Sequence, residues 1–260
     1  MGTANSYSNP PAERPVGASP AINGFSVVQR RLMGLERLPA SDLAQIQALE
    51  TAAHCHERGV DILVEGDDHG PLYIQVDGWA CRYRLIEDGR RQILDFVLPG
   101  DWYDLTASED LPYTASIGMV TPSLAAATPP GFRRRCAEAH PRLLEAIEAM
   151  RGEAVRRLEA QVTMLGRLSA CEAMLMFVSR TFRRLAAVGL VEDNGAPFPL
   201  TQETLGDHLG LSTVHVNRTL KVLKEEWGVR VADGRLTIAD PAAVHTAVSD
   251  TDPGAHRLPS

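Results

Sequence analysis

The stretch LTQETLGDHLGLSTVHVNRTLKVLKEE, residues 200–226, decides the fold of the C-terminal part of the chain. Thr201 is suited to cap a short helix, and Gly210 ends that helix in the left-handed conformation that glycine adopts without strain. Ser212 then caps a second helix, which we expect to run to about Trp227. Two helices joined by so short a turn predict a helix-turn-helix.

The second helix of this segment has two faces. At about 100° per residue, Val216, Leu220 and Leu223 form a buried side, and the small residue Gly206 lets the first helix approach it. The opposite side is polar and basic, which suits the DNA major groove. The predicted DNA-binding residues are Ser212, Thr213, Val214, His215, Asn217, Arg218 and Lys221.

Several of these side chains suit one particular contact with DNA. Arg218 has the donor geometry for two parallel hydrogen bonds to guanine, Asn217 suits a base edge or a phosphate, and Val214 suits a thymine methyl group. Lys221, Ser212 and the N-terminus of the helix suit backbone phosphates. We therefore predict sequence-specific binding of double-stranded DNA.

A hairpin follows this helix pair. Residues 229–238 form two short β-rich runs joined by Asp233-Gly234, and both turn residues tolerate positive φ. Arg230 and Arg235 suit contacts of a wing with the neighbouring DNA backbone. Residues 167–240 hold nine basic and nine acidic residues, so the acidic excess of the chain lies outside this region.

A helix-turn-helix also occurs in proteins that never bind DNA. The neutral charge of the C-terminal region supports an alternative, a ligand-binding or scaffold module whose winged helix mediates protein contacts. An enzyme has less support, because the chain has no phosphate-binding glycine loop, no GxSxG turn and no HExxH pair.

Before this region, residues 141–167 show a long helical pattern. At ~1.5 Å per residue such a helix exceeds ~30 Å, more than one small domain needs, so we predict a dimer seam, with a core helix as the alternative. Ser169 and Glu172 fit a capping box that starts a new helix, and we place the domain boundary there. The apolar stripe of the long helix consists of Leu144, Ile147, Ala154, Leu158, Val162 and Leu165.

Short β-rich runs precede the long helix, spaced by about 8–12 residues as in a small antiparallel barrel or sandwich. The predicted strands are 62–64, 72–76, 79–86, 93–98, 117–120 and 124–127. Asp77-Gly78 and Asp88-Gly89 are typical hairpin turns. A helix over 41–58, capped by Ser41 and ended by Gly59, comes before the strands.

Composition describes an ordinary globular chain. Its 260 residues correspond to one or two domains at roughly 150 residues each, and its formal net charge is −7. No apolar run approaches the ~18 residues that a membrane span needs, and the N-terminus lacks a secretion signal. We expect a cytoplasmic protein without a membrane partner, with a disordered tail over 1–23 and a flexible tail over 249–260.

The order of these parts resembles the Crp/Fnr family of bacterial transcription regulators, in its alphaproteobacterial type. The resemblance covers roughly residues 40–240. It is strongest in residues 200–226, and next in GWACRYRLIEDGRRQILDFVLPGDW, residues 78–102. Familiar members carry Glu where this chain has Val214, so its DNA site should differ in part from theirs.

The resemblance implies an α+β architecture. It consists of a β-roll like a cyclic-nucleotide-binding domain over 24–140, a dimerisation helix over 141–167 and a winged helix-turn-helix DNA-binding domain over 168–248. It also implies a homodimer that binds a palindromic DNA site and contacts RNA polymerase. The effector, the target genes and the direction of regulation do not follow from it.

The resemblance bears on cofactors as well. Members that bind cyclic AMP use a Gly-Glu-Leu turn and an Arg-Ser-Ala segment, where this chain has 102–106 and 114–116, with Ala115 in place of the phosphate-pairing Arg. A buried anion without its guanidinium lacks the main offset to desolvation. Oxygen-sensing members hold an iron–sulfur cluster with N-terminal cysteines, and residues 1–54 contain none. We therefore expect neither cofactor.

His54-Cys55-His56, with His69 and Cys81 further on, could ligate a metal or haem. On the predicted helix, however, neighbouring residues fan out by about 100°, so the two histidines cannot easily share an ion. We expect a polar helix end with a buried thiol, and neither metal nor haem. The four cysteines, Cys55, Cys81, Cys136 and Cys171, form no CxxC pair, which argues against a disulfide framework.

Overall fold

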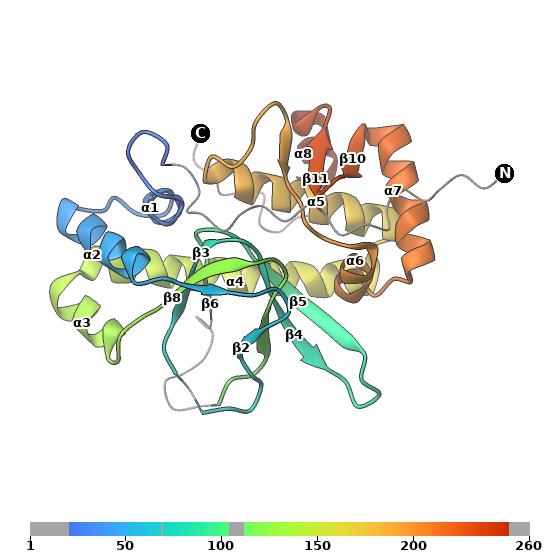
Figure 1. Cartoon of the computed structure of the whole chain (residues 1–260). Helices are drawn as coiled ribbons and strands as arrows, with labels where there is room; N and C mark the ends of the chain where they lie inside the picture. Colours follow the sequence, from blue (N-terminus) through green and yellow to red (C-terminus); the bar gives the residue numbers. More distant parts are fainter. Residues whose placement is uncertain (1–20, 69, 104–111, 250–260) are drawn as a thin grey trace. The chain divides into compact units, whose positions relative to one another are not determined.

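A computed structural model describes residues 21–68, 70–103 and 112–249 (Figure 1). The predictions for the outer parts of both tails, for His69 and for residues 104–106 lie outside this part of the chain. The chain divides into two compact units. The roll unit contains residues 21–161 and 187–189, and the C-terminal unit contains 162–186 and 190–249. Among the described residues, no helix combines the length and apolarity that a membrane crossing requires.

The roll unit is built on two four-stranded antiparallel sheets. The first has the order β1-β8-β3-β6, with bounds His54–His56, Ser123–Ala127, Tyr73–Asp77 and Trp102–Tyr103. The second has the order β2-β7-β4-β5, with bounds Asp61–Leu63, Ser116–Met119, Ala80–Leu85 and Arg91–Val97. All six predicted strands are confirmed within a residue or two, and the short strands β1 and β6 join them.

The two Asp-Gly turns of the roll have different roles. Asp88-Gly89 closes the hairpin of β4 and β5, as predicted. Asp77-Gly78 does not close a hairpin, because β3 and β4 belong to different sheets, and this prediction was wrong. Gly78 has a φ of 78°, and a Cβ there would lie 2.4 Å from Ser123 Oγ and 2.5 Å from the Pro122 carbonyl oxygen. The chain needs glycine at this point to pass from one sheet to the other.

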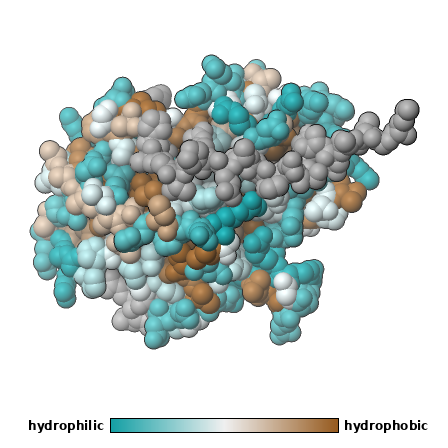
Figure 2. Space-filling view, viewed as in Figure 1, coloured by the Kyte–Doolittle hydropathy of each residue, from teal (hydrophilic) through white to brown (hydrophobic). Residues whose placement is uncertain are grey.

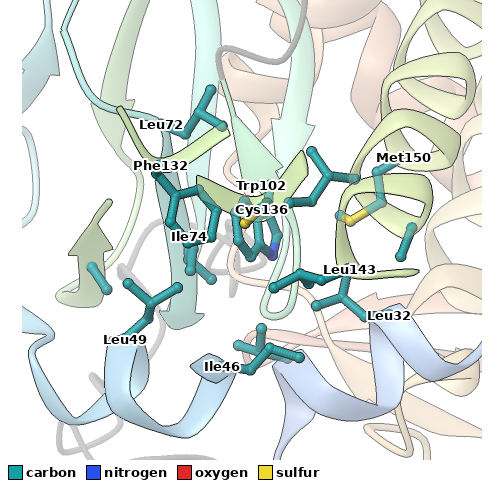
Figure 3. Close-up of a cluster of buried hydrophobic side chains, with 14 of the residues drawn as sticks. Leu32, Ile46, Leu49, Leu72, Ile74, Trp102, Phe132, Cys136, Leu143 and Met150 are labelled. Atoms are coloured by element: carbon teal, nitrogen blue, oxygen red, sulfur yellow. The ribbon is translucent and has the colours of Figure 1, made fainter. Parts of the chain in front are cut away.

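Helices cover one side of the first sheet. They are α1 (Val27–Met33), α2 (Ala40–Thr51), α3 (Phe132–Ala139) and the start of α4 (Pro141–Arg167). Figure 3 shows their buried side chains around Trp102, whose ring centroid lies 5.8 Å from that of Phe132. Cys136 lies in this cluster, and Cys81 is buried elsewhere in the roll, so both thiols belong to the core. A second cluster, which includes Leu63, Ile117 and Ala125, joins the two sheets.

The helix predicted over 41–58 is shorter than expected. α2 begins at Ala40 and ends at Thr51, and Pro39 rather than Ser41 takes the N-cap position, without a side-chain hydrogen bond. Residues 54–56 form strand β1 because they pair with Ser123–Ala125 of β8, an interaction between distant parts of the chain. Cys55 is exposed rather than buried. The prediction of a polar helix end with a buried thiol was therefore wrong.

The long helix predicted over 141–167 is present as α4, but its apolar stripe is divided. Ile147 and Leu144 pack into the roll core, so this half of the stripe is not the exposed seam that we predicted. Val162 and Leu165 further along are exposed, by 72% and 46% respectively. On the face drawn in Figure 2, hydrophobic residues lie in separate patches among hydrophilic ones.

The C-terminal unit combines helices with a small sheet. Its elements are α5 (Ala170–Ala187), β9 (Gly195–Pro197), α6 (Gln202–Leu209), α7 (Thr213–Trp227), β10 (Val229–Ala232), β11 (Arg235–Ile238) and α8 (Pro241–Ser249). The capping box is confirmed, since the Ser169 amide donates to Glu172 Oε2 at 2.8 Å and the Glu172 amide donates to Ser169 Oγ at 3.4 Å. The sheet has the order β10-β11-β9. Strand β9 and helix α8 were not predicted.

Candidate nucleic-acid interface

The helix-turn-helix forms as the sequence predicts. Thr201 Oγ1 caps α6 by accepting a hydrogen bond from the Thr204 amide at 3.1 Å. Gly210 ends α6 with a φ of 66°. At Gly206, a Cβ would lie 2.4 Å from the Leu211 carbonyl oxygen, so the backbone of the turn occupies the space that any larger residue needs. Glycine at these positions sets the close approach of α6 and the turn.

Helix α7 is fixed at its start and along its buried side. Ser212 Oγ accepts a hydrogen bond from the His215 amide at 3.3 Å, which confirms the predicted cap. Val216 and Leu223 are fully buried, whereas Leu220 is only half-buried. Thr219 is also buried, and its hydroxyl donates to the His215 carbonyl oxygen at 3.0 Å. The helix ends at Trp227, as predicted.

The predicted DNA-binding residues lie on the opposite, solvent-facing side. Val214 is 69% exposed, so its methyl groups are accessible to a partner. Asn217 is half-buried. The exposed members are Ser212, Thr213, Val214, His215, Arg218 and Lys221, and Lys224 extends the same side. We call this set, with Asn217, the α7 face.

The cations of the α7 face have no partners of their own. Within the described ranges, Arg218, Lys221 and Lys224 form neither an ion pair nor a hydrogen bond with another side chain. Elsewhere most arginines of the roll do, for example Arg157, whose Nε lies 2.6 Å from Asp95 Oδ2. Unpaired cations on an exposed helix leave their charge available to phosphates.

The hairpin after α7 is confirmed. β10 and β11 pair in register, with Arg230 opposite Thr237, and Asp233 and Gly234 in the turn have φ values of 51° and 71°. Arg230 and Arg235 are exposed. Strand β9 adds a third strand on β11. The wing is therefore braced on one side.

Two buried features of this unit escaped sequence reasoning. His208 is 3% exposed, and its ring centroid lies 4.7 Å from that of Phe177 on α5, so this histidine belongs to the core. The other is Thr219, a polar residue on the buried side of α7. Its spacing was the available indication. Thr219 lies three residues after Val216 and four before Leu223, so it shares their buried face.

In the described part of the roll unit, a small cavity lies beside α4, lined by Asp95, Asp101, Tyr103 and Arg157 among others. Its volume is about 40 Å³. Burial opposes the charge on Arg157, but the carboxylates of Asp95 and Asp101 outweigh burial and raise the pKa of this guanidinium above its ordinary value. Arg31 on α1 pairs with Asp101 and with Glu153 of α4. The cavity wall is thus already neutralised by the chain itself.

Two family models match the chain. A Crp-like helix-turn-helix domain matches residues 184–246, which contain α6, α7 and the wing. A cyclic nucleotide-binding domain matches residues 55–140, which contain most of the roll.

Relatives match over most of their length. The nitrogen fixation regulation protein FixK of Bradyrhizobium diazoefficiens is 31% identical over 208 residues, 80% of this chain and 86% of the relative. The transcriptional activator protein FnrL of Cereibacter sphaeroides is 27% identical over 233 residues, 84% of this chain and 89% of the relative. The solved structure of FixK2 from Bradyrhizobium japonicum shares the fold, with a TM-score of 0.65 at 22% identity over 75% of this chain and 95% of that one.

Proposed function

The chain belongs to the Crp/Fnr family of transcription regulators, and from that premise we propose that two copies bind one palindromic DNA site. Members of this family are sequence-specific DNA-binding regulators rather than enzymes, and this chain is one of them. The observation that carries the proposal is the α7 face, a row of exposed polar side chains and unpaired cations behind a capped helix start. We propose that this face enters the major groove.

We assign one role to each kind of side chain on the α7 face. Arg218 donates two hydrogen bonds to a guanine, and Asn217 contacts a neighbouring base edge or phosphate. Val214 packs its exposed methyl groups on a thymine methyl. The rest hold the backbone. We assign phosphate contacts to Ser212, His215, Lys221 and Lys224, with Arg230 and Arg235 of the wing, whereas Thr213 faces the bases with Val214, Asn217 and Arg218.

The dimer proposal rests on α4. Val155, Val162 and Leu165 are exposed apolar residues whose spacing of seven and three places them on one side of the helix. Exposed apolar rows on long helices are covered most simply by the same row of a second copy. Productive binding then requires the two α7 helices to lie ~34 Å apart, one turn of DNA.

We propose that signals reach the DNA through α4. The roll packs against the first half of this helix, and the joint at Ser169 connects it to α5. A change in the roll would alter the direction of α4 and hence the spacing of the two α7 helices. We further propose contact with RNA polymerase and a cytoplasmic location, where the chromosome of a bacterium lies.

We also propose that the roll takes no cyclic nucleotide. The cavity beside α4 has a volume of about 40 Å³, whereas pockets for small ligands have ~300–1,000 Å³. Its lining places Asp95 and Asp101 beside Arg82 and Arg157, and Arg157 already pairs with Asp95, so the cavity has no excess of positive charge for a phosphate. Ala115, where nucleotide-binding members carry Arg, is buried and apolar. We likewise propose that the chain holds neither haem nor an iron–sulfur cluster.

Selection of bound DNA from a random pool tests this function. We expect full-length protein to enrich an inverted repeat whose half-sites are centred ~10 base pairs apart, and light scattering to give two chains per site. If the pool stays unenriched and the dissociation constant stays at ~10⁻⁴–10⁻⁶ M, the protein binds DNA only non-specifically. That outcome would refute the proposal and favour a role of the winged helix in protein contacts.

A further inference from the structure

Strand β1 places two histidines on one face of a sheet edge. It is the outermost strand of the first sheet, and its only strand partner there is β8. Side chains alternate along a strand, so His54 and His56 share one face while Cys55 lies on the other. The register agrees, because His54 and His56 lie opposite Ala125 and Ser123, and Cys55 lies opposite Leu124. The two imidazoles are therefore neighbours.

The space around these imidazoles is open. Their cross-strand neighbours, Ala125 and Ser123, are small residues. His54 is exposed and His56 is half-buried. In the part of the chain that the structure describes, neither ring forms a hydrogen bond or ion pair. Both rings keep their nitrogen lone pairs available.

The spacing of the two residues along the strand suits a shared ion. Residues two apart along a strand are separated by ~6.6 Å, a distance that two imidazoles leaning together can bridge through one ion.

We propose that His54 and His56 form a two-histidine site for a divalent transition-metal ion of the zinc, copper and nickel group. Neutral imidazole is a preferred ligand for these ions, which it binds at ~2.0–2.1 Å in the case of zinc. Within the described ranges no group of three His, Cys, Asp or Glu side chains gathers, so the chain supplies two ligands and water completes the shell. Such a site is open and its ion exchanges readily.

The strand geometry is what makes this site. On a helix, His54 and His56 would differ by about 200° in direction and could not share an ion. On β1 they point the same way, whereas the exposed thiol of Cys55 points to the opposite face and takes no part. The site is thus one of imidazole ligands alone, and Cys55 provides a matched control one residue away from each ligand.

Metal titration of the full-length, untagged protein tests the proposal. We expect Zn²⁺ or Cu²⁺ to bind with one ion per chain at a site that His54→Asn and His56→Asn each weaken by roughly 100-fold, because either change removes chelation by two linked ligands. Cys55→Ser should leave the affinity unchanged. His140→Asn should also leave it unchanged, since this histidine pairs with Asp42 at 2.7 Å elsewhere in the roll.

Spectroscopy gives a second, independent readout. Electron paramagnetic resonance of the Cu²⁺-loaded protein should show coupling to two imidazole nitrogens, and to one in either single variant. Affinity that survives in the double variant His54→Asn/His56→Asn would overturn the proposal. Loss of the site in Cys55→Ser would overturn it as well, because the ion would then belong to the thiol. Thermal unfolding checks that each variant is folded, which we expect for substitutions at exposed or half-buried positions.

Discussion

Helix α7 and strand β1 both present polar side chains to solvent, but different parts of the chain hold them in place. α7 depends on the residues directly before it, namely the Ser212 cap and the turn at Gly210. β1 depends on β8, whose Ala125 lies opposite His54 although it is far along the chain. A segment of the first kind keeps its structure through local geometry. A segment of the second kind exists only when the roll is assembled.

The largest effect is expected at Gly78, whose substitution would break the support of β1. In Gly78→Ala the Cβ meets Ser123, the residue paired with His56, and strain at positive φ adds ~1–2 kcal/mol to a clash of ~1–3 kcal/mol. Gly89→Ala is the matched control, because Gly89 also follows Asp at positive φ but a Cβ there meets nothing within 4 Å. Chemical denaturation measures the free energy of unfolding of both variants. Equal losses of stability would contradict the packing that we describe around Gly78.

The corresponding change on the α7 side is Gly206→Ala. Its Cβ meets the Leu211 carbonyl oxygen, which belongs to the backbone of the turn, and we expect a loss of ~1–3 kcal/mol together with reduced DNA binding. Gly166→Ala on α4 is the control, since nothing lies within 4 Å of that Cβ and a helical alanine gains up to ~1 kcal/mol. Denaturation and a DNA-binding assay report the two effects. If Gly206→Ala changed neither the free energy of unfolding nor DNA binding, the fold would tolerate a larger distance between α6 and the backbone of the turn.

Arg218→Ala sharpens the assignment of the α7 face. We expect it to lose ~1–3 kcal/mol of discrimination at one base pair, because only that pair loses its bidentate partner. Lys221→Ala should instead weaken all sequences alike and reduce the salt dependence by about one phosphate contact. Competition binding with single-base-pair variants of the selected site, at several salt concentrations, separates the two. An equal loss on every sequence would make Arg218 a phosphate contact.

The smallest effect concerns two thiols of the roll. Burial, followed by the negative charge of Asp42, raises the pKa of Cys136 to about 11 from an ordinary 9.0. The unfolded chain loses this proton first, so the stability that the neutral thiol contributes is complete below pH 9 and is lost as the pH rises to 11. In Cys136→Ala this part of the pH slope should disappear, whereas the exposed Cys55→Ala should keep it. Denaturation between pH 9 and pH 11 gives the slopes, and identical slopes would contradict the burial argument.

Local rules were sufficient for the helix-turn-helix and the wing of the C-terminal unit. Thr201 and Ser212 cap the two helices, Gly210 ends the first, and Asp233-Gly234 turns the wing, each as the residue types predict. In every case the residues that determine the conformation lie within one turn of it. Strand β9 is an exception. Its three residues are too few for a periodic pattern, and their pairing with β11 is decided across the chain.

The same rules failed at β1 for a physical reason. The residues after Thr51 contain no helix breaker before Gly59, so local propensity favours a longer helix. Pairing with Ser123–Ala125 overrides that preference, and no sequence pattern near residue 54 predicts this pairing. The role of Asp77-Gly78 was missed in the same way, because a turn sequence does not tell which sheet the next strand joins. For the α7 face, exposure was predictable, while the DNA contacts remain a prediction.

The distribution of tryptophans has a practical consequence. The chain has three, of which Trp79 and Trp102 are buried in the roll and Trp227 is the half-buried last residue of α7. Replacing the first two by phenylalanine would leave a single tryptophan, at the end of the helix that we place on DNA. The emission of that fluorophore would report on α7 alone, without any attached dye, while the unmodified chain reports mainly on the roll. Tryptophan fluorescence can therefore follow each compact unit separately.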